Sequence, residues 1–313
     1  MIEINNMDFG YSSKKKIFKN LNLSLTQGHI YGLLGKNGMG KTTLLKIISG
    51  LRFCDSGNVS VFGLQSEKRM AEMLSDIYFV TEEMDVPALK ISEFVDIYSP
   101  FYPNFSQRDF EKYLGQFEIE DTTQKLTKLS HGQKKKVIVS FALASNTKLL
   151  IMDEPTNGMD IPSKSIFRKV VAEAINDDKT FIISTHQVRD LQNVIDAVVV
   201  LDNGEILLNA DMNTICKKLS FKVLNPFEFD ELSKQGKVLY SEDNIMGKVA
   251  ICTHLDNDDD DQFDMELLFC AAIAEKKKMN EIFSASEEAK RDGKSNFAEE
   301  MEYKLNYKNQ ENE

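Results

Sequence analysis

The sequence has no long apolar run. Hydrophobic residues make up 42% of its 313 positions, yet no uninterrupted apolar stretch approaches the roughly 18–20 residues that a helix needs to cross a bilayer. The N-terminus also lacks the basic and apolar regions of a secretory signal. We therefore expect no membrane span in this chain, and contact with a membrane only through a partner.

Cysteine is scarce, and no segment is strongly basic. The four cysteines lie far apart without a C-x-x-C pair, a pattern that favours reduced thiols in a cytosolic protein over disulfides or a metal site. The net charge is −11, and an acidic chain without a basic block argues against nucleic acid as a partner.

The acidic excess is concentrated in the last third of the chain. Residues 1–210 hold 26 acidic and 24 basic side chains, whereas residues 211–313 hold 23 acidic and 14 basic ones. This shift predicts a boundary near residue 210. We expect a main domain over 1–210, a small α+β accessory domain over 211–283 and a polar tail over 284–313. The tail is either a mobile segment or a short docking helix.

Apolar runs of strand length alternate with helical segments in the main domain. The alternation predicts a largely parallel sheet covered on both faces. Strands are expected at Ile2–Phe9, Leu21–Leu25, Ile30–Leu34, Asn58–Phe62, Ile77–Val80, Lys148–Met152, Thr180–Ser184 and Ala197–Leu201, and helices at Lys134–Ser145, Pro162–Ile175 and Val188–Val194. Asp202-Asn-Gly204 predicts a hairpin turn to Glu205–Leu208, because Asn-Gly readily adopts positive φ.

The accessory region has its own pattern. Three strands are expected at Leu219–Leu224, Lys237–Tyr240 and Lys248–Thr253, followed by an acidic loop at Asp256–Asp261 and a helix over Gln262–Phe283.

The most informative segment is a glycine-rich stretch after the apolar run Ile30–Leu34. It reads Gly35-Lys-Asn-Gly-Met-Gly-Lys-Thr-Thr43. Its glycines let backbone N–H groups converge on phosphate oxygens, Lys41 adds a positive charge, and Thr42 offers a hydroxyl to Mg²⁺. The segment predicts a nucleoside triphosphate site with contacts from Gly35, Asn37, Gly38, Gly40, Lys41, Thr42 and Thr43.

A second chemical element is an acidic pair at the end of a buried strand. Asp153 and Glu154 follow the apolar run Leu149–Met152. With a phosphate loop upstream, we expect Asp153 to hold Mg²⁺ and Glu154 to act as general base toward the attacking water.

Two further segments carry polar groups. In Leu129-Ser-His-Gly-Gln133, Ser130 and Gln133 predict a capping box, and Gly132 leaves backbone N–H groups uncovered. The start of this helix is either an ordinary capped N-terminus or a second phosphate-binding site. His186 ends the apolar run Thr180–Ile183, where the ends of a parallel sheet line up beside a nucleotide.

Together, these segments resemble the ATP-binding subunit of an ABC (ATP-binding cassette) protein over residues 1–210. The resemblance implies an α/β P-loop NTPase core, with a mostly parallel sheet, an antiparallel β subdomain and a helical subdomain at about 85–146. It also implies ATP and Mg²⁺ as cofactors. Lys41, Glu154 and the switch histidine His186 would act in catalysis.

The same resemblance assigns the other motifs. Ser130, Gly132 and Gln133 fall in the signature motif, and Asp160 falls in the D-loop. Tyr11 lies where an aromatic ring stacks on adenine, the alternative being a strand-end residue packed on the core. Two subunits are expected to face each other head to tail, so that the signature of one closes over the ATP of the other.

Two positions depart from the family pattern. His131 stands in the signature where Gly is commonest. Glu82 stands, within one residue, where a Gln usually contacts Mg²⁺ or water. We expect Glu82 to keep a metal-related role while adding negative charge.

The helical subdomain contains an aromatic cluster of Phe94, Tyr98, Phe101, Tyr102 and Phe105. These residues either pack in the core or line a groove for a membrane partner.

The stretch Gln262–Phe269 resembles the closing helix of subunits that serve bacterial ABC-2-type exporters. The resemblance implies a cytoplasmic ATPase, peripheral on the inner face of the cell membrane, that drives export through a separate polytopic permease. The alternative is a soluble single-cassette ATPase with a regulatory or assembly role.

Overall fold

The computed structural model describes residues 1–12, 15–245, 247–253 and 263–283. The chain divides into two units, one of Met1–Ile215 with Phe263–Phe269, the other formed by the remaining residues from Cys216 onward. The division falls five residues after the expected boundary, and Phe263–Phe269 join the first unit rather than the accessory domain. The expected acidic loop and polar tail lie outside the described residues.

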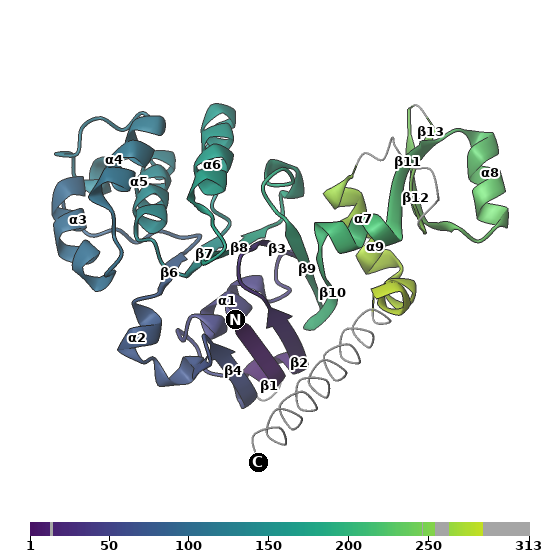
Figure 1. Ribbon diagram of the computed structural model, residues 1–313, viewed down its shortest axis with the longest axis horizontal. Coiled ribbons are helices and arrows are strands. Elements are labelled where there is room, and N and C mark those ends of the chain that lie inside the picture. The colour runs from purple at the N-terminus through teal and green to yellow at the C-terminus, as the bar shows by residue number, and fades with distance from the viewer. Residues whose placement is uncertain (13–14, 246, 254–262, 284–313) are drawn as a thin grey trace, which may run out of the picture. The chain divides into compact units, whose positions relative to one another are not determined.

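The centre of the first unit is a six-stranded, mostly parallel sheet (Figure 1). Its order is β10-β9-β3-β8-β7-β6, comprising β10 (Glu205–Asp211), β9 (Ala197–Asp202), β3 (Ile30–Leu34), β8 (Thr180–Thr185), β7 (Leu149–Asp153) and β6 (Ile77–Val80). All neighbours run parallel except β10, which forms a hairpin with β9. The four interior strands β9, β3, β8 and β7 are buried along their whole length, as expected for a parallel sheet covered on both faces.

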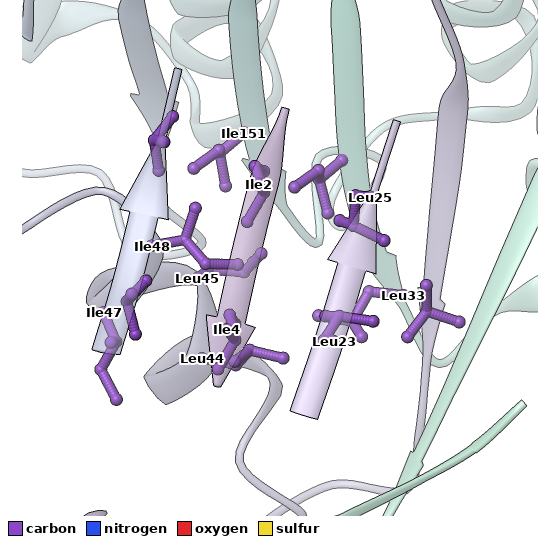
Figure 2. Packing of buried hydrophobic residues seen from close by; sticks show 14 of the residues in the cluster. Ile2, Ile4, Leu23, Leu25, Leu33, Leu44, Leu45, Ile47, Ile48 and Ile151 are labelled. Carbon is purple, nitrogen blue, oxygen red and sulfur yellow. The ribbon is translucent and has the colours of Figure 1, made fainter. Parts of the chain in front are cut away.

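A second, antiparallel sheet has the order β2-β1-β4-β5, with β2 (Lys15–Leu25), β1 (Ile2–Ser12), β4 (Ser56–Val61) and β5 (Leu64–Gln65). Buried residues alternate with exposed ones at the start of β1 and the end of β2, because only one face of this sheet packs inward. Figure 2 shows Ile2, Ile4 and Leu23 beside side chains of helix α1 (Lys41–Ile48). The α/β P-loop fold predicted from the sequence is confirmed.

The helical subdomain contains α3 (Ile91–Tyr98), α4 (Gln107–Gln116) and α5 (His131–Ala144), which lie together in Figure 1. Phe141 of α5 contacts the rings of Phe94, Tyr102, Phe105 and Phe110. It also contacts Tyr78 of β6. The subdomain core is therefore a ring cluster centred on the helix that carries the signature residues.

Two helical expectations need correction. Val188–Val194 forms only a 3-10 turn at Val188–Asp190. The helix expected over Gln262–Phe283 begins, in the described residues, at α9 (Met265–Ala274) and is interrupted at Glu275 before a further helical run over 276–283. The first unit also contains α2 (Ala71–Leu74) and α6 (Ile161–Ala174).

The second unit contains a three-stranded antiparallel sheet of order β11-β13-β12, with β11 (Leu219–Leu224), β13 (Gly247–Thr253) and β12 (Val238–Asn244). Helix α8 (Pro226–Lys234) packs Phe229 and Leu232 on Leu224, Ala250 and Cys252. The sequence reading missed α8, although Asn225 and Glu228 form its capping box. It also missed α7 (Met212–Lys218). Within the described part of the chain, no helix is long and apolar enough to cross a membrane.

Candidate functional site

The glycine-rich loop runs from the end of β3 to the start of α1 and has no room for a larger residue at Gly35 or Gly40. Gly38 and Gly40 have φ of +81° and +102°, values that favour glycine. A Cβ atom on Gly40 would come within 2.9 Å of the Phe18 ring, and one on Gly35 within 2.6 Å of the Leu201 carbonyl oxygen. The loop is therefore held close against β2 and β9, which fixes the direction of its backbone N–H groups.

Lys41 is the first residue of α1 and is only 7% exposed. Its Nζ donates to the Gly35 carbonyl oxygen at 2.6 Å and lies 3.9 Å from Glu154 Oε1. Burial lowers the pKa of Lys41, although nearby carboxylates, Glu154 first, act in the opposite direction. The loop thus places a buried ammonium group directly beside the acidic pair.

Thr42 and Asp153 lie in contact across the sheet edge. The Thr42 hydroxyl donates to Asp153 Oδ2 at 2.6 Å, and Ser184 of β8 donates to Asp153 Oδ1. The contact between Ser184 and Asp153 arises because β7 and β8 run parallel, with these two residues opposite each other. Three hard oxygen donors therefore lie within one small region. The sequence reading did not include Ser184.

Glu154 is held in an unusual backbone conformation, with φ of +47°. Its N–H donates to Ser184, and its Oε1 lies 2.8 Å from Nδ1 of His186. Its Oε2 is buried without a hydrogen-bond partner among the described residues. Burial raises the pKa of this carboxyl group, and the hydrogen bond with His186 acts against that rise. A fixed carboxylate with one free oxygen and a raised pKa suits a general base.

Lys135 is a buried cation near Glu154. The sequence did not indicate it as a site residue. It lies on α5 and is 0% exposed. Its Nζ donates to the carbonyl oxygens of Glu154 and Glu82 at 3.1 and 3.2 Å. Glu82 Oε1 in turn accepts a hydrogen bond from Asn157 Nδ2 at 3.2 Å. The signal in the sequence was the run Lys134–Lys136, in which one lysine falls on the buried face of a helix.

The phosphate loop, the acidic pair and His186 border one open cavity of about 580 Å³. It is lined by Tyr11, Lys15, Lys16, Ile17, Asn37, Gly38, Met39, Gly40, Lys41, Thr42, Thr43, Glu82, Asp153, Glu154, His186, Asn203 and Gly204. The sequence did not indicate the Asn203-Gly204 turn or the start of β2 as site residues. They line the cavity because the β9–β10 hairpin lies beside the phosphate loop, and a contact between segments so far apart in the chain has no local sequence pattern.

Tyr11 lies at the mouth of the cavity and is 52% exposed. Its hydroxyl lies 2.9 Å from Thr43 Oγ1, and the Arg52 guanidinium is 4.8 Å from its ring centroid. Its ring also packs at 82° to the ring of Phe9, with the centroids 5.3 Å apart. A half-exposed ring with one edge on the core can both pack and offer a face to a base.

The signature residues Ser130, Gly132 and Gln133 are absent from the lining of this cavity. Ser130 and Gln133 form the predicted capping box at the start of α5. A Cβ on Gly132 would come within 2.9 Å of the Gly158 carbonyl oxygen, so the motif packs on the loop after β7. Asp160 ends that loop by capping α6, accepting from the N–H of Ser163.

The arrangement defines a class of protein. A glycine loop at a strand end, a helix that starts with a buried lysine and an acidic pair on a neighbouring parallel strand make a P-loop nucleoside triphosphatase.

Comparisons with known proteins give the particular family. A sequence profile described as ABC transporter matches residues 18–157. The bacitracin transport ATP-binding protein BcrA of Bacillus licheniformis is 32% identical over 73% of this chain and 74% of its own length. A putative ABC transporter ATP-binding protein of Pyrococcus furiosus is 31% identical over 68% and 84%. The chain belongs to the family of ABC transporter ATP-binding proteins and is an ATP-hydrolysing cassette.

Solved structures agree on the fold. The ATP-binding subunit of an ABC transporter superposes with a TM-score of 0.62 at 22% identity, over 75% of this chain and 98% of that one. A dimeric cassette in a post-hydrolysis state with ADP and phosphate gives a TM-score of 0.61 at 23% identity, over 68% and 99%.

Proposed function

We propose that this chain is the ATP-hydrolysing subunit of a membrane transporter, acting as a head-to-tail dimer on a separate permease to drive export. The observation that carries the catalytic part is the position of Glu154. Its carboxylate is held by His186, lies beside Lys41 and keeps one buried oxygen free. Glu154 lines the same cavity as the phosphate loop.

Each residue has a distinct task in hydrolysis. The loop N–H groups and Lys41 bind the β- and γ-phosphates. Glu154 orients the attacking water and accepts its proton, and the raised pKa of this carboxyl group makes it a better base. His186 holds Glu154 through Nδ1 and contacts the γ-phosphate. Tyr11 stacks on the adenine ring.

Thr42, Asp153 and Glu82 are the residues proposed to hold Mg²⁺. The hydroxyl and carboxylate oxygens of Thr42 and Asp153 are already in contact, and oxygen donors from one or two side chains plus phosphates suit this ion. Among the described residues, no group of three or more His, Cys, Asp or Glu side chains forms a metal site, which fits an ion held largely by the nucleotide. When bound, Mg²⁺ neutralises charge on the transferring phosphoryl group.

The dimer is proposed from the place of the signature residues. Ser130 and Gly132 do not line the cavity of their own chain, yet the N-terminus of α5 offers N–H groups to an anion. A second copy in head-to-tail orientation brings these groups to the γ-phosphate, with Gln133 and Asp160 nearby. ATP then bridges two copies, and hydrolysis removes the shared contacts.

The surface that would contact the permease is proposed to lie on the helical subdomain. It includes fewer of the aromatic residues than the sequence suggested. Phe94 is buried, and Tyr102 and Phe105 pack on Phe141, so these three belong to the core. Tyr98 and Phe101 are 38% and 66% exposed. Exposed aromatic residues on a turn are typical interface anchors.

Export is supported by the relatives. They include the bacitracin transport protein and a linearmycin resistance ATP-binding protein of Bacillus subtilis, 31% identical over 70% of this chain. Through the permease, the subunit is placed on the cytoplasmic face of the membrane.

The test is affinity purification of Glu154→Gln from its own cells, in mild detergent with Mg-ATP, because the variant is expected to hold ATP and trap the closed dimer. Recovery of a polytopic membrane protein is the expected result. Recovery of soluble partners only would overturn the transporter proposal in favour of a regulatory or assembly ATPase. Wild-type protein without ATP serves as the control.

A further inference from the structure

Lys135 is a charged side chain without solvent exposure. It lies on α5, five residues after Ser130, and burial lowers its pKa. Burying an ammonium group is costly unless it is hydrogen-bonded and near opposite charge. Here it donates to two backbone carbonyl oxygens, with carboxylates of Glu82, Asp153 and Glu154 nearby.

The two acceptors belong to residues that line the catalytic cavity. Glu154 follows β7 and Glu82 follows β6. One side chain on the signature helix therefore joins the ends of two strands of the parallel sheet. Phe141 also contacts the sheet, but its ring interactions impose no fixed hydrogen-bond geometry.

The backbone of Glu154 needs such support. A non-glycine residue with positive φ is uncommon and persists only where the surroundings hold it. Ser184 fixes the Glu154 N–H, and its carbonyl oxygen accepts from Lys135 Nζ and from the Asn157 N–H. Without Lys135, only the turn hydrogen bond from Asn157 would hold this carbonyl oxygen. The backbone of Glu154 would then be less constrained, and its carboxylate less firmly held in the position in which it meets His186.

We propose that Lys135 is a positioning residue for hydrolysis, tying the backbones of Glu154 and Glu82 to the helix that carries the signature. The proposal rests on Glu154 acting as the base. It predicts that loss of the ammonium group impairs turnover more than ATP binding, because Lys135 is absent from the cavity lining, whereas Lys41 and the loop are part of it.

The experiment compares Lys135→Met with wild type, since methionine keeps most of the length but cannot donate. We expect kcat to fall at least tenfold while the Kd for a fluorescent ATP analogue, measured by direct titration, changes less than threefold. An unchanged kcat, or a parallel loss of kcat and affinity, would overturn the proposal.

A matched control is Lys179→Met. Lys179 is a half-buried lysine that donates to the Ala174 carbonyl oxygen and to Asn146, and it lies outside the cavity lining. We expect this variant to lower Tm by an amount similar to Lys135→Met without a change in kcat. If Lys179→Met reduces kcat equally, loss of any buried lysine is the cause, and the proposal fails.

A double-mutant cycle separates this inference from the assignment of the base. If Lys135 acts through Glu154, adding Lys135→Met to Glu154→Gln leaves the residual single-turnover rate unchanged within threefold. A further tenfold loss in the double variant would show independent action and refute the positioning role. A native rate in Glu154→Gln alone would instead refute the base assignment.

Discussion

The ring of His131 packs against the backbone of Gly158, so that a Cβ atom on Gly158 would lie 2.7 Å from His131 Nδ1. His131 occupies the position where the family most often has glycine. This chain therefore fills a space between the signature motif and the loop after β7 that a glycine would leave open. The contact ties two segments that are both proposed to face the second subunit.

Gly158→Ala is expected to destabilise the cassette through this contact. Gly63 is a matched control, because both glycines have φ of +78° but a Cβ on Gly63 meets nothing within 4 Å. Backbone strain alone should cost Gly63→Ala about 1 kcal/mol. The added clash should bring Gly158→Ala to about 2–3 kcal/mol. Denaturant unfolding measures both values, and equal losses would contradict the role of His131.

The contact also predicts a rescue. In a His131→Gly background, Gly158→Ala should lose only as much stability as Gly63→Ala, because the ring is no longer in the way.

The kcat/KM for ATP hydrolysis should fall at low pH as Glu154 becomes protonated. A base must be deprotonated, and burial raises the pKa of this carboxyl group above the usual 4.5. The fraction of carboxylate, and with it kcat/KM, therefore falls as pH decreases through the raised value and is constant above it. A pH profile of kcat/KM measures the midpoint. A midpoint at or below 4.5 would argue against Glu154 as the titrating base.

Lys41→Ala should weaken ATP binding at least tenfold, because it removes the buried ammonium group from the phosphate loop. Lys36→Ala is the control within the same loop, since the Lys36 side chain is exposed and absent from the cavity lining. We expect its Kd to stay within threefold of wild type by calorimetry. Similar losses in both variants would mean that net loop charge, rather than the placed ammonium group, drives binding.

Phe101→Ala should reduce binding to the partner, whereas Tyr102→Ala should reduce stability. Phe101 is 66% exposed, so its removal should leave Tm nearly unchanged but abolish co-purification with the proposed permease. Tyr102 packs on Tyr78 and Phe141, and truncating a core aromatic costs about 3 kcal/mol. Thermal unfolding and membrane pull-down of the same two variants decide this. Retained permease binding in Phe101→Ala would remove this surface from the proposal.

The sequence predicted the parts of the site that follow local rules. The phosphate loop and the acidic pair were predictable because each motif combines its residues with a strand or helix in a short segment. The contacts of Lys135 and Ser184 were not, since they join residues 19 and 30 positions from Glu154. The separate roles of Phe101 and Tyr102 depend on which neighbour faces Phe141, which composition alone does not specify.

Phe141 has a mechanical consequence. Ring contacts run from exposed Phe101 to Tyr98, from Tyr98 to Phe94 and from Phe94 to Phe141, with centroids 6.5, 4.6 and 5.0 Å apart. Aromatic rings are rigid, so a displacement of Phe101 at the surface would be transmitted to α5 through only three ring contacts. The ring contacts therefore connect exposed Phe101 to α5, the helix that Ser130 caps.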